Sequence, residues 1–378
     1  MKKLRVALLA AAHLFMDMTT VAFVFVLTGV REFALPENGA VGLSENAAFA
    51  VSACILAYDL IAFGAQPFLG ALTDVGRRAA PALYLSLSVA GVAAVLCVLC
   101  GFPQGIHAFS VALLVLFALC NAAFHVSAGA FVIPESEKKS APLGVFVSLG
   151  AIGVAAGRLY APSVLLWAGV GCILFAAAAA ALKTRDAVLV PYFERTRLLR
   201  AEKEADVFPL LLILFAVFMR GFCGTALAAV YPSAPSLVLL AAFFAAAGKA
   251  AGGFVSDRFG VRAAVAVCLP LSACLLFFGG GVPALYLAGT LLFNTSMPVT
   301  LWLSFAALPR YRNAAFGLCA AFLMIGSVGA MFVQVPRVAA FALALCGAAA
   351  VFFAPHFLKN KTVLPVVRIK EVEHDGIS

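Results

Sequence analysis

Charged side chains are scarce in this sequence. Asp, Glu, Lys and Arg make up 11% of the 378 residues, whereas soluble domains carry roughly 25%. Apolar residues make up 64%, which is more than one soluble core can bury, so the chain is predicted to lie in a lipid bilayer. The apolar runs do not alternate with polar residues, and this favours transmembrane helices over a barrel.

Long apolar runs follow one another along almost the whole chain, and each is long enough to cross a membrane as a helix. Twelve spans are predicted, at residues 6–30, 47–70, 80–101, 108–132, 142–160, 163–182, 208–231, 236–256, 263–281, 284–307, 314–335 and 338–357. The fold class is therefore an all-α membrane protein. No small-residue cleavage pattern follows the first run, so we expect a retained helix and not a signal peptide.

The basic residues gather at one end of the predicted hairpins. If the N-terminus lies inside, most of the 26 lysines and arginines fall in cytosolic segments. The positive-inside rule therefore predicts that both termini lie in the cytosol, with the helices in an inner or plasma membrane. The formal net charge of +9 needs no nucleic acid to explain it, because these charges would lie beside anionic membrane lipids.

One long polar stretch interrupts the apolar part and divides the spans six and six. The predicted organisation is an N-terminal six-helix bundle at 1–182, a cytosolic central loop at 183–207, a C-terminal six-helix bundle at 208–358 and a cytosolic tail at 359–378. The central loop is either a helix on the inner membrane surface or a solvated tether between the bundles.

A short loop pattern occurs twice, after the second span and after the eighth. The complete copy reads G-x-x-x-D-R-x-G-x-R and contains Gly253, Asp257, Arg258, Gly260 and Arg262. The other copy is one residue shorter, has no arginine next to the acid, and contains Gly70, Asp74, Gly76, Arg77 and Arg78. We expect both acids to accept hydrogen bonds from backbone amides or basic groups in a cytosolic gate; the alternative is a topology anchor only.

Other matches between the halves support a duplicated six-helix unit. Asn121 and Asn294 lie 173 positions apart, and so do Gly144 and Gly317. Twelve spans, an internal duplication and the loop pattern together resemble the major facilitator superfamily of transporters. The resemblance implies two pseudo-symmetric six-helix bundles, with spans one, four, seven and ten around a central cavity.

Two further patterns are similar to the fosmidomycin-resistance exporter branch of that superfamily. They are His13-x-x-x-Asp17 in the first span and Asn121-Ala-Ala-Phe-His125-Val-Ser-Ala-Gly129 in the fourth, where Val126 replaces the usual proline. The resemblance implies that a common chamber is lined by His13, Asp17, Asn121, His125, Arg220 and Asn294.

A charged side chain inside a bilayer costs several kcal/mol unless it has a partner, a wet cavity or a role. Asp17 and His13 are one helical turn apart, so they could take up and release a proton together, or form a buried pair that fixes helix packing. Arg220 could bind an anionic group, or hold Asp17 when the site is empty. Asp59, Lys249 and Arg158, which ends a glycine ladder in the fifth span, are expected to gate or to pair with neighbouring charges.

These observations predict a secondary transporter that moves a small organic molecule with an anionic or zwitterionic group by alternating access. Proton-coupled export, as an antiporter, is the first hypothesis; a proton-coupled uptake symporter, a lipid flippase and a transport-dead sensor are the alternatives. Protons and membrane lipids are the expected partners, and the chain is expected to act as a monomer.

Enzymatic activity is not expected. The sequence has no H-E-x-x-H and no P-loop, and Tyr58-Asp59 lacks the Gly-x-Gly-Asp partner of an intramembrane aspartyl protease. No cofactor or metal site is predicted either, because Cys97 and Cys100 form a C-x-x-C pair without a second pair and are expected to fill space at a helix end.

Overall fold

The computed structural model describes residues 2–27, 45–76, 79–101, 107–181, 205–228, 234–279 and 281–359. The regular structure in these ranges is helical, and 12 segments are long and apolar enough to span a membrane. Each segment overlaps one predicted span, so the all-α membrane fold class is confirmed. The central loop at 183–204, the tail after Lys359, and Arg77 and Arg78 lie outside the described residues.

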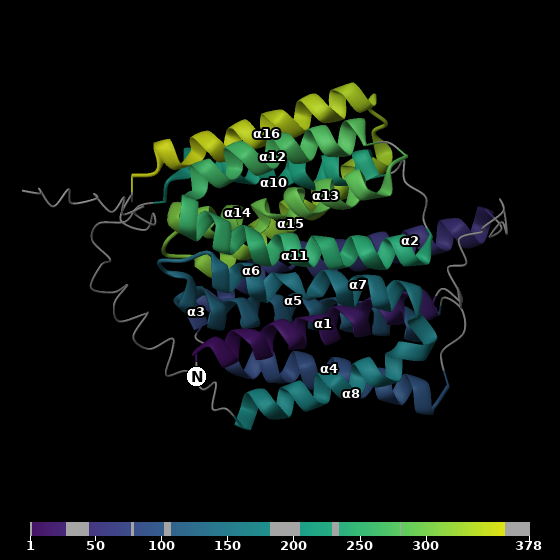
Figure 1. The fold of residues 1–378 in the computed structure, drawn as a ribbon. Helices are drawn as coiled ribbons and strands as arrows, with labels where there is room; N and C mark the ends of the chain where they lie inside the picture. The colour runs from purple at the N-terminus through teal and green to yellow at the C-terminus, as the bar shows by residue number, and fades with distance from the viewer. Residues whose placement is uncertain are drawn as a thin grey trace, which may run out of the picture.

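The first six spans form the N-terminal half, which runs from purple to teal in Figure 1. Its helices are α1 (Lys2–Leu27), α2 (Glu45–Gly64), α3 (Gln66–Gly76), α4 (Ala79–Leu99), α5 (Ala108–Val132), the short 3₁₀ helix η1 (Ile133–Ser136), α6 (Ala141–Ser148), α7 (Gly150–Leu159) and α8 (Ala161–Ala181). The second span is broken between α2 and α3 because Pro67 has no N–H to give to the preceding turn. Beside this break, the side-chain amide of Gln66 donates to the Ala62 carbonyl at 3.0 Å.

The last six spans form the C-terminal half, which is green to yellow and lies beside the first half in Figure 1. Its helices are α10 (Val207–Ala228), α11 (Pro235–Phe259), α12 (Val261–Phe278), α13 (Pro283–Asn294), α14 (Ser296–Ala307), α15 (Arg312–Phe332) and α16 (Arg337–Phe357). The tenth span is broken between α13 and α14 at Thr295, three residues before Pro298. Each half therefore has a span that a proline interrupts.

One end of the bundle is strongly basic. It is the end where α1 begins, and successive spans return to it with Lys3, Arg5, Lys138, Lys139, Arg258, Arg262, Arg310 and Lys359. We call it the basic end, and the other the opposite end.

Glycines allow the two halves to approach each other closely near the basic end. A β-carbon on Gly70 of α3 would lie 2.7 Å from the Ala314 nitrogen of α15, and one on Gly253 of α11 would lie 2.6 Å from Ala141 Cα of α6. A β-carbon on Gly317 of α15 would likewise lie against the backbone of Gln66 and Pro67. The helix pairs α3 with α15 and α6 with α11 therefore cross backbone to backbone, and larger side chains would separate the halves.

This packing predicts that Gly317→Ala destabilises the protein. The added methyl group meets the backbone of α3, which cannot move aside as a flexible side chain would. Overpacking of this kind costs about 1–3 kcal/mol. We expect a fall of several degrees in the melting temperature of the detergent-purified protein.

Gly329→Ala, on the same helix, is the matched control, because its methyl group would meet only the Phe222 ring at 3.8 Å. Both substitutions replace glycine by alanine within α15, so both raise the intrinsic helix propensity by the same amount. Equal melting temperatures for the two variants would contradict the close crossing.

Candidate functional site

Three titratable side chains from two helices meet inside the N-terminal half. His13 and Asp17 come from α1, and His125 comes from α5. His13 Nε2 lies 2.8 Å from His125 Nε2 and 3.1 Å from Asp17 Oδ2, and His125 Nε2 lies 3.7 Å from Asp17 Oδ1. All three residues are less than 9% exposed. We call His13, Asp17 and His125 the triad.

Backbone carbonyls fix the tautomers of both histidines. Nδ1 of His13 lies 3.0 Å from the Phe146 oxygen, and Nδ1 of His125 lies 2.9 Å from the Asn121 oxygen. A carbonyl oxygen can only accept, so each Nδ1 carries a hydrogen and donates it. In the neutral rings both Nε2 atoms would then present lone pairs to each other. At a separation of 2.8 Å, a cation between them, such as a proton, would remove this repulsion.

Polar groups on neighbouring helices hold Asp17 in place. Asn121 donates from Nδ2 to Asp17 Oδ1 at 3.0 Å and to Thr20 Oγ1 at 3.2 Å, and Tyr58 donates to Thr20 at 2.8 Å. On the remaining side, a β-carbon on Gly150 of α7 would lie 2.6 Å from Asp17 Oδ2. The glycine therefore makes the room in which the triad fits.

The triad faces two basic residues of the other half. A cavity of about 170 Å³ is lined by the triad on one side and by Arg220 of α10 and Lys249 of α11 on the other. Sequence reasoning expected Arg220 here, but it expected gating or ion pairing for Lys249. The cavity thus lies between the halves, with its acid in one half and these two cations in the other.

Arg220 binds an asparagine of its own half. It donates from Nη2 to Asn294 Oδ1 at 3.1 Å, and its guanidinium lies 6.0 Å from the centre of the Phe293 ring. Its buried Nε has no hydrogen-bond partner among the described residues. Of the two expected roles, the contact with Asp17 is not formed, because Asp17 pairs with the histidines. An unpaired donor remains for another acceptor.

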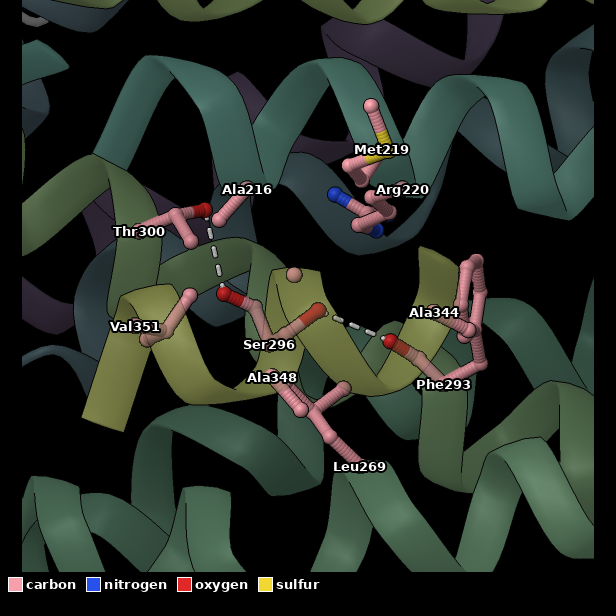
Figure 2. A pocket seen from close by; sticks show the side chains of 11 residues that line it. Ala216, Met219, Arg220, Leu269, Phe293, Ser296, Thr300, Ala344, Ala348 and Val351 are labelled. Carbon is pink, nitrogen blue, oxygen red and sulfur yellow. Dashed lines mark hydrogen bonds between the residues drawn. The ribbon is translucent and has the colours of Figure 1, made fainter. Parts of the chain in front are cut away.

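A second pocket beside Arg220 is too small for an organic ligand. Its volume is about 20 Å³, close to the space that one water molecule needs. Figure 2 shows that Arg220 shares this pocket with the α14 residues Ser296 and Thr300, whose hydroxyl groups donate to backbone carbonyls of the same span. Space for a ligand at Arg220 therefore lies in the cavity that it shares with Lys249, and in a further cavity of about 230 Å³ that it lines together with Asn294 and Ser327.

Asp59 shares a cavity with one member of the triad, and Arg158 lies at the opposite end. Asp59 lines a cavity of about 300 Å³ together with Asp17 and Asn121 from the N-terminal half and Ser327 from the C-terminal half. Arg158 is in the last turn of α7, at the opposite end. The lining of the larger cavity continues to Met331, near the end of α15, so the triad has a cavity between it and the opposite end.

Both acids of the repeated loop bind the start of a helix in the other half. Asp74 accepts from the backbone nitrogens of Asn313 and Ala314 at 3.2 and 3.0 Å, and from Asn313 Nδ2 at 2.8 Å. Asp257 accepts from the backbone nitrogens of Ser140 and Ala141 at 2.6 and 3.1 Å, and from Ser140 Oγ at 3.0 Å. Each carboxylate satisfies helix donors that would otherwise be unpaired and lies at the positive end of the helix dipole.

The partners of the two acids occupy equivalent positions in the internal repeat. Ser140 and Asn313 are 173 positions apart, the same offset that relates Asn121 to Asn294. Sequence reasoning missed Ser140 and Asn313 as partners, although this offset could have pointed to them. Trp302 of α14 adds a third contact between the halves, because its Nε1 donates to the Ser136 carbonyl at 2.9 Å.

The other motif residues turn the chain at the basic end. Gly260 has a φ of 84°, in the left-handed region that glycine adopts most easily. Arg258 and Arg262 are exposed, and the Arg258 guanidinium lies 5.7 Å from the centre of the Phe259 ring. In the complete copy the acid therefore joins the halves, while both arginines remain at the surface.

Comparison with known proteins identifies the fold. No family model matches the chain, and no curated protein matches it in sequence. Among solved structures, the human organic anion transporter MFSD10 (TETRAN) is similar, with a TM-score of 0.57 and 17% identity over 95% of this chain and 98% of that one. The chain therefore has the major facilitator fold, with twelve transmembrane helices in two six-helix bundles. The similarity does not confirm the fosmidomycin-resistance branch.

The contacts of the repeated acids predict that Asp257→Asn loosens the basic end. Hydrogen bonds to a charged group contribute about 1.5–3 kcal/mol, so the ratio of closed to open molecules should fall roughly tenfold or more. Trp302, 2% exposed, can report this change. In a Trp167→Phe background it is the sole tryptophan, and iodide should quench it more strongly once the basic end opens.

The effect of Asp74→Asn on Trp302 should be smaller, because Asp257 and not Asp74 holds the segment next to Ser136. Asp206→Asn is the matched control: Asp206 Oδ2 accepts from the Lys359 nitrogen within the C-terminal half and does not bridge the halves. If neither motif variant quenches more than this control, the acids do not hold the basic end closed.

Proposed function

We propose that this chain is a secondary active transporter that moves a small organic anion or zwitterion across the inner or plasma membrane by alternating access. The observation that carries the proposal is the cavity between the halves, in which a buried acid–histidine triad faces Arg220 and Lys249. Transport is coupled to protons and runs outward as antiport. Both termini and the basic end lie in the cytosol, as the distribution of basic residues favours.

Alternating access requires contacts between the halves that can break and form again. The hydrogen bonds of Asp74 and Asp257 fit this need, because each joins a carboxylate to a helix start that water could solvate after separation. With these contacts formed, the cytosolic side is closed and the substrate site communicates with the other side. The acids of the repeated loop thus act as a cytosolic gate.

Proton coupling is assigned to the triad. A proton between the two Nε2 atoms relieves the repulsion of their lone pairs and partly balances the charge of Asp17. After loss of that proton, Asp17 faces only the charges of Arg220 and Lys249 across the cavity. Proton binding and release therefore change the electrostatic balance of the cavity that the substrate shares.

The anionic substrate class follows from Arg220 and Lys249. Both line the cavity, and the buried Nε of Arg220 lacks an acceptor among the described residues. A carboxylate or phosphate group would supply acceptors for both side chains. The structural neighbour MFSD10 is an organic anion transporter, which agrees with this proposal. Apolar walls, including Phe316 and Leu323, would contact the rest of the substrate.

The substrate class predicts that organic anions stabilise the protein through Arg220. A thermal-stability screen of purified protein against metabolites and antibiotics, at two pH values, should find anionic or zwitterionic ligands that raise the melting temperature. Arg220→Gln should abolish the shift. Arg337→Gln should not, because Arg337 donates to the carbonyls of Leu276 and Phe277 as a structural residue. A ligand shift that persists in Arg220→Gln would move the substrate site elsewhere.

Proton coupling predicts a separation of two activities in Asp17→Asn. With the ligand from the screen in proteoliposomes, wild type should accumulate it against its gradient when a pH gradient is imposed. The variant should lose this accumulation but still exchange labelled for unlabelled ligand, because exchange needs no net proton movement. Equal accumulation by wild type and variant at all pH gradients would remove Asp17 from the coupling. The direction of the imposed gradient that drives accumulation separates export from uptake.

A further inference from the structure

The triad has the composition and spacing of a metal-ligand set. Two imidazole Nε2 atoms and one carboxylate converge, and all three ligand atoms lie within 4.8 Å of one another. The sequence patterns predicted no metal site, because the ligands are divided between the first and fourth spans. We propose that a divalent first-row transition-metal ion displaces the proton between the two Nε2 atoms and binds between His13, Asp17 and His125.

The separations of the ligand atoms suit such an ion. In a tetrahedral site with metal–ligand bonds of about 2.0–2.1 Å, two ligand atoms lie about 3.3 Å apart. The two Nε2 atoms lie 2.8 Å apart, His13 Nε2 lies 3.1 Å from Asp17 Oδ2, and His125 Nε2 lies 3.7 Å from Asp17 Oδ1, so each oxygen of the carboxylate is close to one imidazole. A rotation of the Asp17 carboxylate that directs one oxygen at both nitrogens would place the three ligand atoms at three corners of a tetrahedron.

The surroundings of the triad are those of a metal site. Metal-binding histidines commonly donate the other ring N–H to a carbonyl or carboxylate, which directs the free nitrogen at the metal. Both histidines do this, to Phe146 and Asn121. Asp17 Oδ1 is held by the amide of Asn121. Imidazole with one carboxylate favours zinc, cobalt, nickel, iron or manganese over magnesium and calcium, which prefer oxygen ligands alone.

The charges in the cavity indicate what accompanies the metal. Arg220 and Lys249 line the same cavity as the triad, so a bare divalent ion would leave a large uncompensated positive charge. An anion that coordinates the ion and contacts these two side chains would balance it. In this respect the inference rests on the proposed function, since the proposed anionic substrate would occupy the open positions of the metal. The substrate class becomes an organic anion whose oxygens can bind a transition metal.

The site is testable with Co²⁺, whose visible absorption reports nitrogen coordination and low coordination number. Full-length protein, purified and stripped of metal with a chelator, should bind one Co²⁺ per chain with such a spectrum, and Zn²⁺ but not Mg²⁺ should displace it. His125→Gln should weaken binding at least tenfold. Gly150→Ala should weaken it too, because its methyl group would crowd Asp17.

Three controls keep the result specific. His107 and His356 are exposed, so His107→Gln and His356→Gln should bind Co²⁺ as wild type does. Cys97→Ser with Cys100→Ser tests the C-x-x-C pair, and its spectrum should be unchanged. Acetate, a weak carboxylate ligand, should alter the Co²⁺ spectrum of wild type but have less effect on Arg220→Gln.

Two results would overturn the metal site. One is the same Co²⁺ binding in wild type and in His125→Gln. The other is no Co²⁺ binding by folded wild-type protein, with or without acetate.

Flux measurements then separate this inference from the proposed function. Suppose that the protein binds no Co²⁺, and that it accumulates an organic anion in an Asp17-dependent manner even with chelator present. This result would contradict the metal site but support the proposed transport function. Triad-dependent Co²⁺ binding by a protein that shows no flux would support the metal site and contradict the proposed transport function.

Discussion

Two carboxylates join the halves at the basic end, and each caps a helix of the opposite half. Asp74 binds the first turn of α15, and Asp257 binds the first turn of α6. These are the positions at which a helix has unpaired N–H groups and a positive dipole end, so one carboxylate satisfies several donors at once. The glycines beside each acid permit the backbones to come close enough for this contact. Charge, helix geometry and the small size of glycine therefore all stabilise the same two helix crossings, α3 with α15 and α6 with α11.

The symmetry of these closing contacts does not extend to the cavity. The N-terminal half contributes a carboxylate and two histidines, and the C-terminal half contributes Arg220 and Lys249. Where the first half has His125 in its fourth span, the matching position of the tenth span is Pro298. In the proposed transporter, cation binding therefore belongs to one half and anion binding to the other. Movement of the halves changes the distance between the two sites, which gives a physical means of coupling them.

The fold could be predicted from the sequence because it rests on local features: apolar length, basic loops and a repeated motif. The pairing of His13 with Asp17 could also be expected, since both lie on one helix. The contact of His13 with His125 could not, because it depends on how closely α1, α5 and α7 pack, and Gly150 gave no sign of its partner. The place of Lys249 in the cavity could not be predicted for a similar reason: it depends on the crossing of α11 with α6, which no pattern within α11 reveals.

Helices α3 and α11 connect the cavity to the basic end by the same spacing. On α11, Lys249 lines the cavity, Gly253 meets the other half, and Asp257 caps α6; these residues are four apart and so lie along one helix face. On α3, Gln66 lines the same cavity, and Gly70 and Asp74 follow it at the same intervals. Because a helix is stiff over two turns, a ligand that displaces Lys249 would also displace Gly253 and Asp257. Because Gln66 is neutral, an anion would act mainly through α11, and the two otherwise matched crossings would then respond unequally to the same substrate.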